Sequence, residues 1–271
     1  MTGTDFFASL ASGSKANCYV ISIAGSVILI DAGLSYKKTK LRLSNLGIDP
    51  KMIDAVIITH EHCDHTAGLL TLVKNIDAPV YMTQGSYFAF IRGRGFELRN
   101  RITPIAGYGE MAIKENVTAD FRSVPHDSAD CVALKLRGGN FCLGICTDTA
   151  VPPPPEFFAG CSVVALESNY DVHMLAEGSY PEALKHRIRS GCGHMSNESA
   201  AKYAAELEKN GCRGIVLCHL SLENNTPEIA LKTVKEHCAL EVTCAAPDEI
   251  TFCGSITKSI SQNAPERLLV C

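Results

Sequence analysis

Four side chains that readily bind metal ions stand within six residues, in the run HEHCDH over residues 60–65. Imidazole nitrogen and carboxylate oxygen are ligands that suit Zn²⁺ and similar divalent cations. His60 and His62 are two residues apart and can face one ion. Asp64 and His65 follow at once and can face a second. A solvated surface explains one or two histidines, but this density of histidine and aspartate is typical of a metal site.

The metal-binding run follows directly on residues 54–59, DAVIIT, which predict a short buried strand. The run therefore lies on a loop at the carboxyl end of a strand, where side chains from several loops can converge. Similar patterns predict strands at 17–23, 26–31, 78–82, 110–113, 117–124, 129–137, 140–147, 162–166 and 214–218. Helical patterns occur at 37–46, 66–76, 181–189, 197–209 and 227–237. In each half of the chain strands precede helices, which favours two sheets with helices outside them.

Length and composition indicate an ordinary globular protein. The chain has 271 residues, of which 46% are hydrophobic and 20% charged, enough apolar material for a core. We expect a single domain over residues 1–271, with a loose tail from about 259 to 271. The net charge of −4 excludes attraction of nucleic acid by the molecule as a whole, but it allows a local basic patch.

Cysteine usage points to a reducing compartment. The 13 cysteines are odd in number and show no paired spacing, which argues against a disulfide framework. The first residues show no basic segment followed by an apolar one, so no signal peptide is expected. No apolar run approaches the ~18 residues of a membrane span. We therefore expect a cytoplasmic protein with reduced thiols and no membrane contact. Nothing in the sequence indicates a protein partner.

The run HxHxDH after a strand resembles the signature of the metallo-β-lactamase fold. That resemblance implies an α/β fold, a four-layer αββα sandwich, with three later ligands that each stand at a strand end. His126, Asp148 and His219 occur in that order and context. By resemblance, Asp148 bridges two metal ions, and each ion has three further ligands. These are His60, His62 and His126 for one ion, and Asp64, His65 and His219 for the other.

Two further residues resemble parts of RNase Z-type phosphodiesterases. Glu167 follows a predicted strand, and His194 precedes a predicted helix. The resemblance implies that this histidine contacts the scissile phosphate or the leaving oxygen and that the glutamate orients it. A carboxylate next to an imidazole fixes its tautomer and raises its pKa. The alternative is that His194 is only a neighbour of the helix cap at Ser196.

Longer stretches of the sequence match one family more closely. ASGSKANCYV, LIDAGLS, THEHCDH, LESNYDVHML, GHMSNESAA and CHLSLENNTPE resemble the YycJ (WalJ) group of bacterial proteins, in one colinear order from Ser9 to Pro227. The resemblance implies a 5′-to-3′ DNA exonuclease with a role in DNA repair. This chain departs from the group at Lys15-Ala16, at Cys63 and at Tyr170, and none of these positions is an expected ligand.

The expected reaction is phosphodiester hydrolysis by a water that two divalent ions, Zn²⁺ or Mn²⁺, activate. Asp64 would hold that water and accept its proton, and His194 would stabilise charge on the phosphate or leaving group. The substrate is expected to be nucleic acid, with DNA favoured over RNA.

Several polar residues are candidates for contacts with the substrate. Ser12, Ser14 and Asn17 lie in a short loop around Gly13 that could offer backbone N–H groups to an anion, although an ordinary turn explains it equally well. Two basic runs, one with Arg92 and Arg94 and one over 185–189, could guide a phosphate backbone or simply be solvated. The remaining candidates are Asn224 and Asn225.

Two other functions compete with a nuclease. A thioesterase or lactonase of the same fold would use all seven ligands equally well, but it would leave Glu167 and His194 unexplained. A non-catalytic metal-binding module would also fit the fold, yet an open site with a full ligand set is hard to justify structurally.

Overall fold

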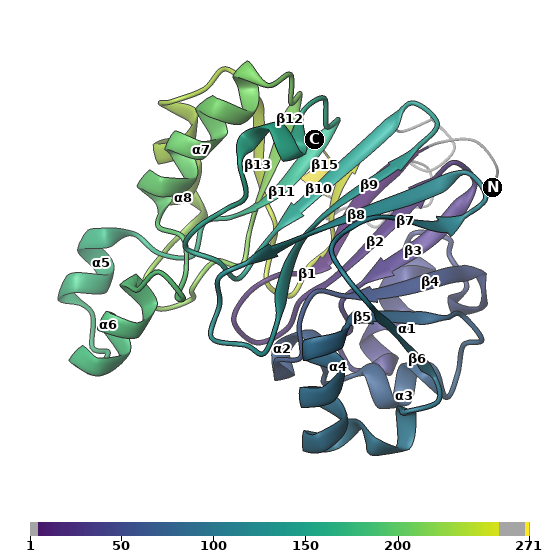
Figure 1. Ribbon diagram of the computed structural model, residues 1–271. Coiled ribbons are helices and arrows are strands. Elements are labelled where there is room, and N and C mark those ends of the chain that lie inside the picture. Colours follow the sequence, from purple (N-terminus) through teal and green to yellow (C-terminus); the bar gives the residue numbers. More distant parts are fainter. Residues whose placement is uncertain (1–4, 255–268, 271) are drawn as a thin grey trace.

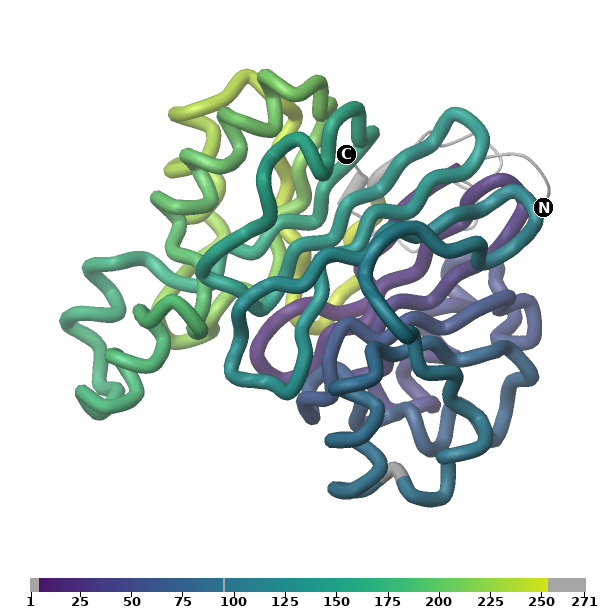
Figure 2. The backbone as a smooth tube through the Cα atoms, in the orientation of Figure 1, coloured from purple at the N-terminus to yellow at the C-terminus, as the bar shows by residue number. Residues whose placement is uncertain are grey.

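The computed structural model describes residues 5–254 and 269–270 (Figure 1). Two β-sheets pack face to face in the middle of the molecule, and helices cover the outer face of each sheet (Figures 1 and 2). The architecture is the αββα sandwich expected from the sequence resemblance.

The first sheet has eight strands in the order β15-β14-β1-β2-β3-β4-β5-β6. Strands β2 and β3 form the predicted hairpin, in which Ala24 and Gly25 turn the chain with positive φ angles of 48° and 80°. Strands β3 to β6 then run parallel. Their bounds are Phe6–Ala11 (β1), Cys18–Ile23 (β2), Ser26–Ile30 (β3), Ile53–Ile58 (β4), Val80–Thr83 (β5), Ile102–Ile105 (β6), Thr251–Gly254 (β14) and Leu269–Val270 (β15).

The second sheet has seven strands in the order β13-β12-β11-β10-β9-β8-β7. Strands β7 to β10 are antiparallel neighbours, and β10 to β13 are parallel. Their bounds are Gly109–Lys114 (β7), Val117–Val124 (β8), Cys131–Gly138 (β9), Phe141–Cys146 (β10), Val163–Glu167 (β11), Gly214–Cys218 (β12) and Glu241–Cys244 (β13).

The helices form the outer layers and one projection. Helices α1 and α3 pack on the first sheet, α7 and α8 on the second, and α5 and α6 project beside the second sheet (Figure 1). Their bounds are Tyr36–Asn45 (α1), Cys63–Thr66 (α2), Leu69–Val73 (α3), Gln84–Phe90 (α4), Val172–Glu177 (α5), Glu182–Arg189 (α6), Asn197–Lys209 (α7) and Pro227–Lys235 (α8). A π-helical turn, η2 (Ile91–Gly95), continues α4.

Hydrophobic burial holds the layers together. One cluster lies between the two sheets and includes Phe7, Ile28 and Phe121, all within 1% of full burial. A second cluster lies between the first sheet and its helices, and a third lies between the second sheet and its helices. Since burying one large apolar side chain contributes about 1.5–3 kcal/mol, these three layers of contact supply the main driving force of folding.

Parallel strands end at one edge of each sheet, and this edge carries the chemistry. Strands β3 and β4 of the first sheet and β10, β11 and β12 of the second all lead into polar residues there. The residues at these ends are Asp31, His60, Asp148, Glu167 and His219. The fold thus brings together side chains that are far apart in the sequence.

The structure differs from the sequence expectations in several elements. Strands β1, β6, β13 and β14 and helices α4 and α5 were not predicted. The helix expected at 66–76 is shorter, Leu69–Val73, and begins after Gly68, whose amide donates to the carbonyl oxygen of Ala32. The short helix Cys63–Thr66 covers part of the metal-binding run, which was expected to be a loop. Residues 259–268 and 271 of the expected loose tail lie outside the described residues, whereas Leu269–Val270 pairs with β14.

Candidate metal centre

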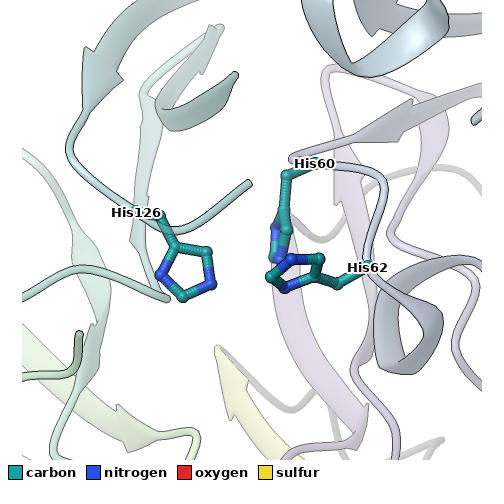
Figure 3. A group of neighbouring side chains, drawn as sticks. All are labelled: His60, His62 and His126. Carbon is teal, nitrogen blue, oxygen red and sulfur yellow. The ribbon is translucent and has the colours of Figure 1, made fainter. Parts of the chain in front are cut away.

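The seven expected ligands converge in space from four loops. Within each of two groups, one ligand atom per residue lies within 4.8 Å of all the others. Figure 3 shows the first group, in which one imidazole from the loop after β8 faces two from the loop after β4. The groups are His60, His62 and His126, and Asp64, His65, Asp148 and His219.

Two imidazoles of the three-histidine group are in the form that a cation needs. Burial lowers the pKa of His60 well below its ordinary value, and it also lowers the pKa of His126. Both imidazoles are therefore neutral, with a lone pair to offer. Nε2 of His60 and Nδ1 of His126 are buried without a hydrogen-bond partner among the described residues. A buried polar atom without a partner costs about 1–3 kcal/mol, so a cation among these rings would supply a partner.

The second group combines two imidazoles with two carboxylates. Nε2 of His65 lies 3.3 Å from Oδ2 of Asp64, and Nε2 of His219 lies 3.5 Å from the same oxygen. Burial lowers the pKa of His65, but Asp148 and the neighbouring carboxylates outweigh burial and raise it well above its ordinary value. The same balance raises the pKa of His219 to about 10. Without a cation, protons occupy these imidazoles.

Asp148 lies between the two groups. Its Oδ1 is 3.3 Å from Nε2 of His219 and 3.8 Å from Nε2 of His126, whereas its Oδ2 is 3.1 Å from Nε2 of His65. Burial raises the pKa of Asp148, but His219 and the other imidazoles lower it well below its ordinary value, so the group is ionised. One carboxylate thus contacts the second group through both oxygens and lies near the first group through Oδ1.

Three of the site residues have left-handed backbone conformations, which set the directions of their side chains. Asp31, Asp148 and His219 have φ angles of 58°, 57° and 56°, and each directly follows a strand or comes two residues after one. Among the described residues, only Ala24 is a further non-glycine with positive φ. Such conformations cost about 1–3 kcal/mol each and persist where the surrounding structure holds them.

Asp31 orients His65, and the sequence did not predict this role. Nδ1 of His65 lies 2.8 Å from Oδ2 of Asp31, which also accepts from the Thr59 hydroxyl at 3.0 Å. With Nδ1–H donated to this carboxylate, Nε2 of His65 is left for a metal ion. The signal was available, because Asp31 ends the apolar strand of the word LIDAGLS.

Two residues expected to contact substrate instead support the ligands. Asn17 is fully buried, and its Nδ2 lies 3.2 Å from Oδ2 of Asp64 and 3.0 Å from Nε2 of His65. The Ser12 hydroxyl is buried and accepts from the His219 backbone N–H at 2.8 Å. Ser14 is exposed, so of the three loop residues its side chain is the one open to a ligand in solution.

Glu167 and His194 meet at the site. Oε1 of Glu167 lies 2.7 Å from Nδ1 of His194 and 3.1 Å from Nδ1 of His219, and its Oε2 accepts from the Thr149 backbone N–H at 2.7 Å. Burial lowers the pKa of His194, but the Glu167 carboxylate outweighs burial and raises it. The ring centroid of His194 lies 5.2 Å from that of His219 and 5.4 Å from that of His126.

Asn224 and Asn225 are buried in the loop before α8. Nδ2 of Asn225 donates to the carbonyl oxygen of Ser168 at 2.9 Å and to Asn197, so its side chain ties this loop to α7. The backbone carbonyl of Asn224 accepts from the Asp171 N–H at 2.8 Å. Their described contacts are with the protein itself.

The two basic runs both reach the metal loops. The Arg94 guanidinium donates to the carbonyl oxygen of Glu61 and to the Thr66 hydroxyl, whereas Arg92 is exposed. On the other side, Arg187 of α6 pairs with Asp127, whose Oδ1 lies 3.4 Å from Nε2 of His126. Asp127 is a second residue that sequence reasoning missed, although it directly follows an expected ligand.

The donor set fits divalent cations. It consists of five imidazoles and two carboxylates held by outer hydrogen bonds, a chemistry that Zn²⁺ and Mn²⁺ both accept. The described helices include none that is both long and apolar enough to cross a membrane.

Comparisons with known proteins agree with this geometry. Residues 12–136 match the metallo-beta-lactamase superfamily. The chain is 32% identical over 232 residues to the exodeoxyribonuclease YycJ of Bacillus anthracis, covering 85% of this chain and 88% of the relative. It is 30% identical over 233 residues to the exodeoxyribonuclease WalJ of Streptococcus pneumoniae, covering 84% and 86%.

A solved structure shows the same fold. The metallo-beta-lactamase fold protein YhfI from Bacillus subtilis superposes with a TM-score of 0.68 at 17% sequence identity, covering 90% of this chain and 98% of that chain. At this identity the likeness concerns the fold alone.

Proposed function

The chain belongs to the YycJ/WalJ family of metallo-beta-lactamase-fold exodeoxyribonucleases, and from this premise we propose that it removes nucleotides from the 5′ end of DNA. It is a metal-dependent hydrolase of phosphodiester bonds. The observation that carries the proposal is the contact of Glu167 with His194 beside the ligand groups, because hydrolysis of a diester needs a proton donor besides the cations.

We propose that the seven convergent side chains hold two divalent cations, Zn²⁺ or Mn²⁺, with Asp148 shared between them. The position of this carboxylate supports the shared role, because its Oδ1 lies 3.8 Å from Nε2 of His126 in the first group and 3.3 Å from Nε2 of His219 in the second. When bound, such cations lower the pKa of a water molecule and neutralise charge on the phosphate.

Asp64 is suited to hold the attacking water and to accept its proton. Burial raises its pKa, but the imidazoles of His65 and His219 lower it well below its ordinary value, so the group is an anion at neutral pH. Its contacts with those imidazoles and with Asn17 are all made through Oδ2. The Asp64 side chain is 21% exposed, whereas that of Asp148, the other carboxylate of the two groups, is 3% exposed.

His194 is suited to serve the departing oxygen. Its raised pKa favours the protonated imidazole, and Nδ1 is held by Glu167, so Nε2 is the nitrogen left for the substrate. A side chain that is 20% exposed can reach a phosphate that enters from solvent. Donation to the leaving oxygen or to a phosphate oxygen stabilises the charge that develops in the transition state.

The free thiols of this chain support a cytoplasmic location. Eleven cysteines are free thiols, and this usage fits a compartment in which thiols stay reduced. A nuclease that trims 5′ ends there fits a role in DNA repair, which we include in the proposal.

The test is digestion of end-labelled DNA and RNA after metal reconstitution, with 5′-phosphate and 5′-hydroxyl ends compared. We expect mononucleotides released from the 5′ end of DNA, and a loss of roughly 100-fold or more in kcat for His194→Ala at unchanged metal content. His237→Ala, at an exposed histidine after α8, is the matched control. Preference for RNA would contradict the proposed substrate, and hydrolysis of only thioester or lactone probes would contradict the proposed reaction.

A further inference from the structure

Three aromatic side chains in the stretch between β5 and β7 are exposed to solvent. Phe88, Phe96 and Tyr108 are 49%, 63% and 55% exposed, and they are the large aromatic side chains that the described residues leave exposed. We call these three residues the aromatic surface. A phenylalanine in water forgoes about 1.5–3 kcal/mol that burial would provide, so two of them on one short segment require an explanation.

Hydrogen bonds join the aromatic surface to the metal loops. The Ser86 hydroxyl, two residues before Phe88 in α4, lies 2.9 Å from Oε2 of Glu61 and 2.7 Å from the carbonyl oxygen of Asp130. The Tyr108 hydroxyl donates to Oδ1 of the same aspartate at 2.7 Å. Glu61 stands between two expected ligands, so α4, which carries Phe88, and the segment that carries Tyr108 are both tied to the loops around the site.

Cationic groups accompany the rings. The Arg99 guanidinium lies over the ring of Phe96, 4.4 Å from its centroid. Arg92 is exposed in the π-helical turn, four residues after Phe88. The one acidic side chain within η2 and the 3-10 turn Phe96–Leu98, that of Glu97, lies 3.5 Å from Nζ of Lys74. The surface therefore presents aromatic faces and positive charge together.

This combination matches the chemistry of an unpaired nucleic acid strand. Aromatic rings stack on bases, and guanidinium groups pair with phosphates, which is how proteins bind single strands with little sequence preference. The bases of a duplex are already stacked on one another, so exposed rings have no base face to contact there. An acidic peptide would use the arginines but would leave the rings without a partner.

We propose that the aromatic surface binds single-stranded DNA next to the metal centre, with bases stacked on Phe88 and Phe96 and phosphates near Arg92. This inference rests on the proposed function, because it assumes a DNA strand that reaches the metal loops. It adds that the enzyme holds its substrate by an unpaired segment.

The test is equilibrium binding of fluorescent oligodeoxythymidine with a phosphorothioate backbone, which the metal-loaded protein holds without cleaving. Two rings at roughly 1–3 kcal/mol each correspond to a loss of at least about 10-fold in affinity for Phe88→Ala/Phe96→Ala. The dependence of affinity on salt should stay unchanged, because no cation is removed. Phe88→Trp/Phe96→Trp should restore binding, since the larger rings also stack.

Leu41→Ala is the matched control, since Leu41 is 60% exposed on α1 and carries no ring. An affinity of Phe88→Ala/Phe96→Ala within about twofold of the parent would overturn the proposal, and so would an equal loss in the control. Hydrolysis of bis-p-nitrophenyl phosphate reads the metal centre separately and should be the same in parent and variants. If the parent bound the oligonucleotide through these rings but hydrolysed no diester, only the proposed function would fall.

Discussion

Glu167 lies 2.7 Å from His194 through Oε1, although 27 positions separate the two residues along the chain. Glu167 ends β11, and His194 stands in the loop before α7, so two layers of the molecule must form before the contact exists. The same oxygen lies 3.1 Å from the ligand His219. One buried carboxylate thus sets the protonation of a proposed acid and the orientation of a proposed ligand.

Replacing Glu167 with glutamine should move the pH dependence of kcat. The Glu167 carboxylate raises the pKa of His194, so its loss lowers that pKa and deprotonates the proposed acid at lower pH. We therefore expect the alkaline limb of the pH profile to shift toward lower pH in Glu167→Gln. Metal analysis of each preparation separates this effect from weaker binding at His219. An alkaline limb that stays in place with full metal content would contradict the proposed role of the pair.

Replacing Asp31 with asparagine should weaken metal binding without removing a ligand. Asp31 accepts the Nδ1 proton of His65, and loss of such an outer partner typically lowers metal affinity about 10–100-fold. Competition with a chelator measures the change. Asp54→Asn is the control, because Asp54 also accepts from a backbone N–H but lies at the start of β4, away from the ligands. Equal affinities in parent and Asp31→Asn would rule out this orienting role.

Metal binding should release protons and should strengthen as the pH rises. The pKa of His219 is raised to about 10, and that of His65 is raised as well, so both bind protons in the metal-free chain at neutral pH. A cation must displace those protons, and this competition weakens as the pH approaches the raised values. Calorimetry in buffers of different ionisation enthalpy counts the released protons. Identical heats in all buffers would show that no proton leaves.

Adding one methyl group at Gly33 should disrupt the metal loop. A Cβ there would overlap the carbonyl oxygen of Asp64 and crowd the backbone nitrogen of Asn17. Overpacking of this kind costs about 1–3 kcal/mol, so Gly33→Ala should lower Tm and metal content together. Gly107→Ala is the control, since a Cβ at Gly107 meets nothing within 4 Å. If both variants unfolded at the same temperature as the parent, the close approach at Gly33 would not constrain the loop.

Local patterns predicted many of the strands well, because alternation and turn residues are local properties. The expected strands at 17–23 and 26–31 correspond to Cys18–Ile23 and Ser26–Ile30, joined by the expected turn. Helix α4 was missed, because glycine and serine in QGSYFAF weaken a helical pattern. It forms where the Thr83 side chain accepts from the Ser86 N–H and the Ser86 hydroxyl meets Glu61, contacts that depend on tertiary structure.

The candidate site also combines residues that a local pattern predicts with residues that only tertiary structure brings in. The run at 60–65 was found from its own spacing, whereas His126, Asp148 and His219 needed a resemblance to a known family. Asp31 supports His65 from 34 positions away, and no local pattern encodes that distance. Asn17 was expected to line a polar loop whose backbone N–H groups bind an anion, but its side chain is fully buried and contacts Asp64 and His65 instead.

The left-handed backbone conformations of Asp148 and His219 place two expected ligands at the expense of backbone strain. Glycine adopts these conformations without strain, so glycine at either position would relax the backbone by part of the ~1–3 kcal/mol held there. The same change would delete a ligand. The strain at these two turns is therefore the cost of placing side chains that contact one another and the other ligands in the buried centre.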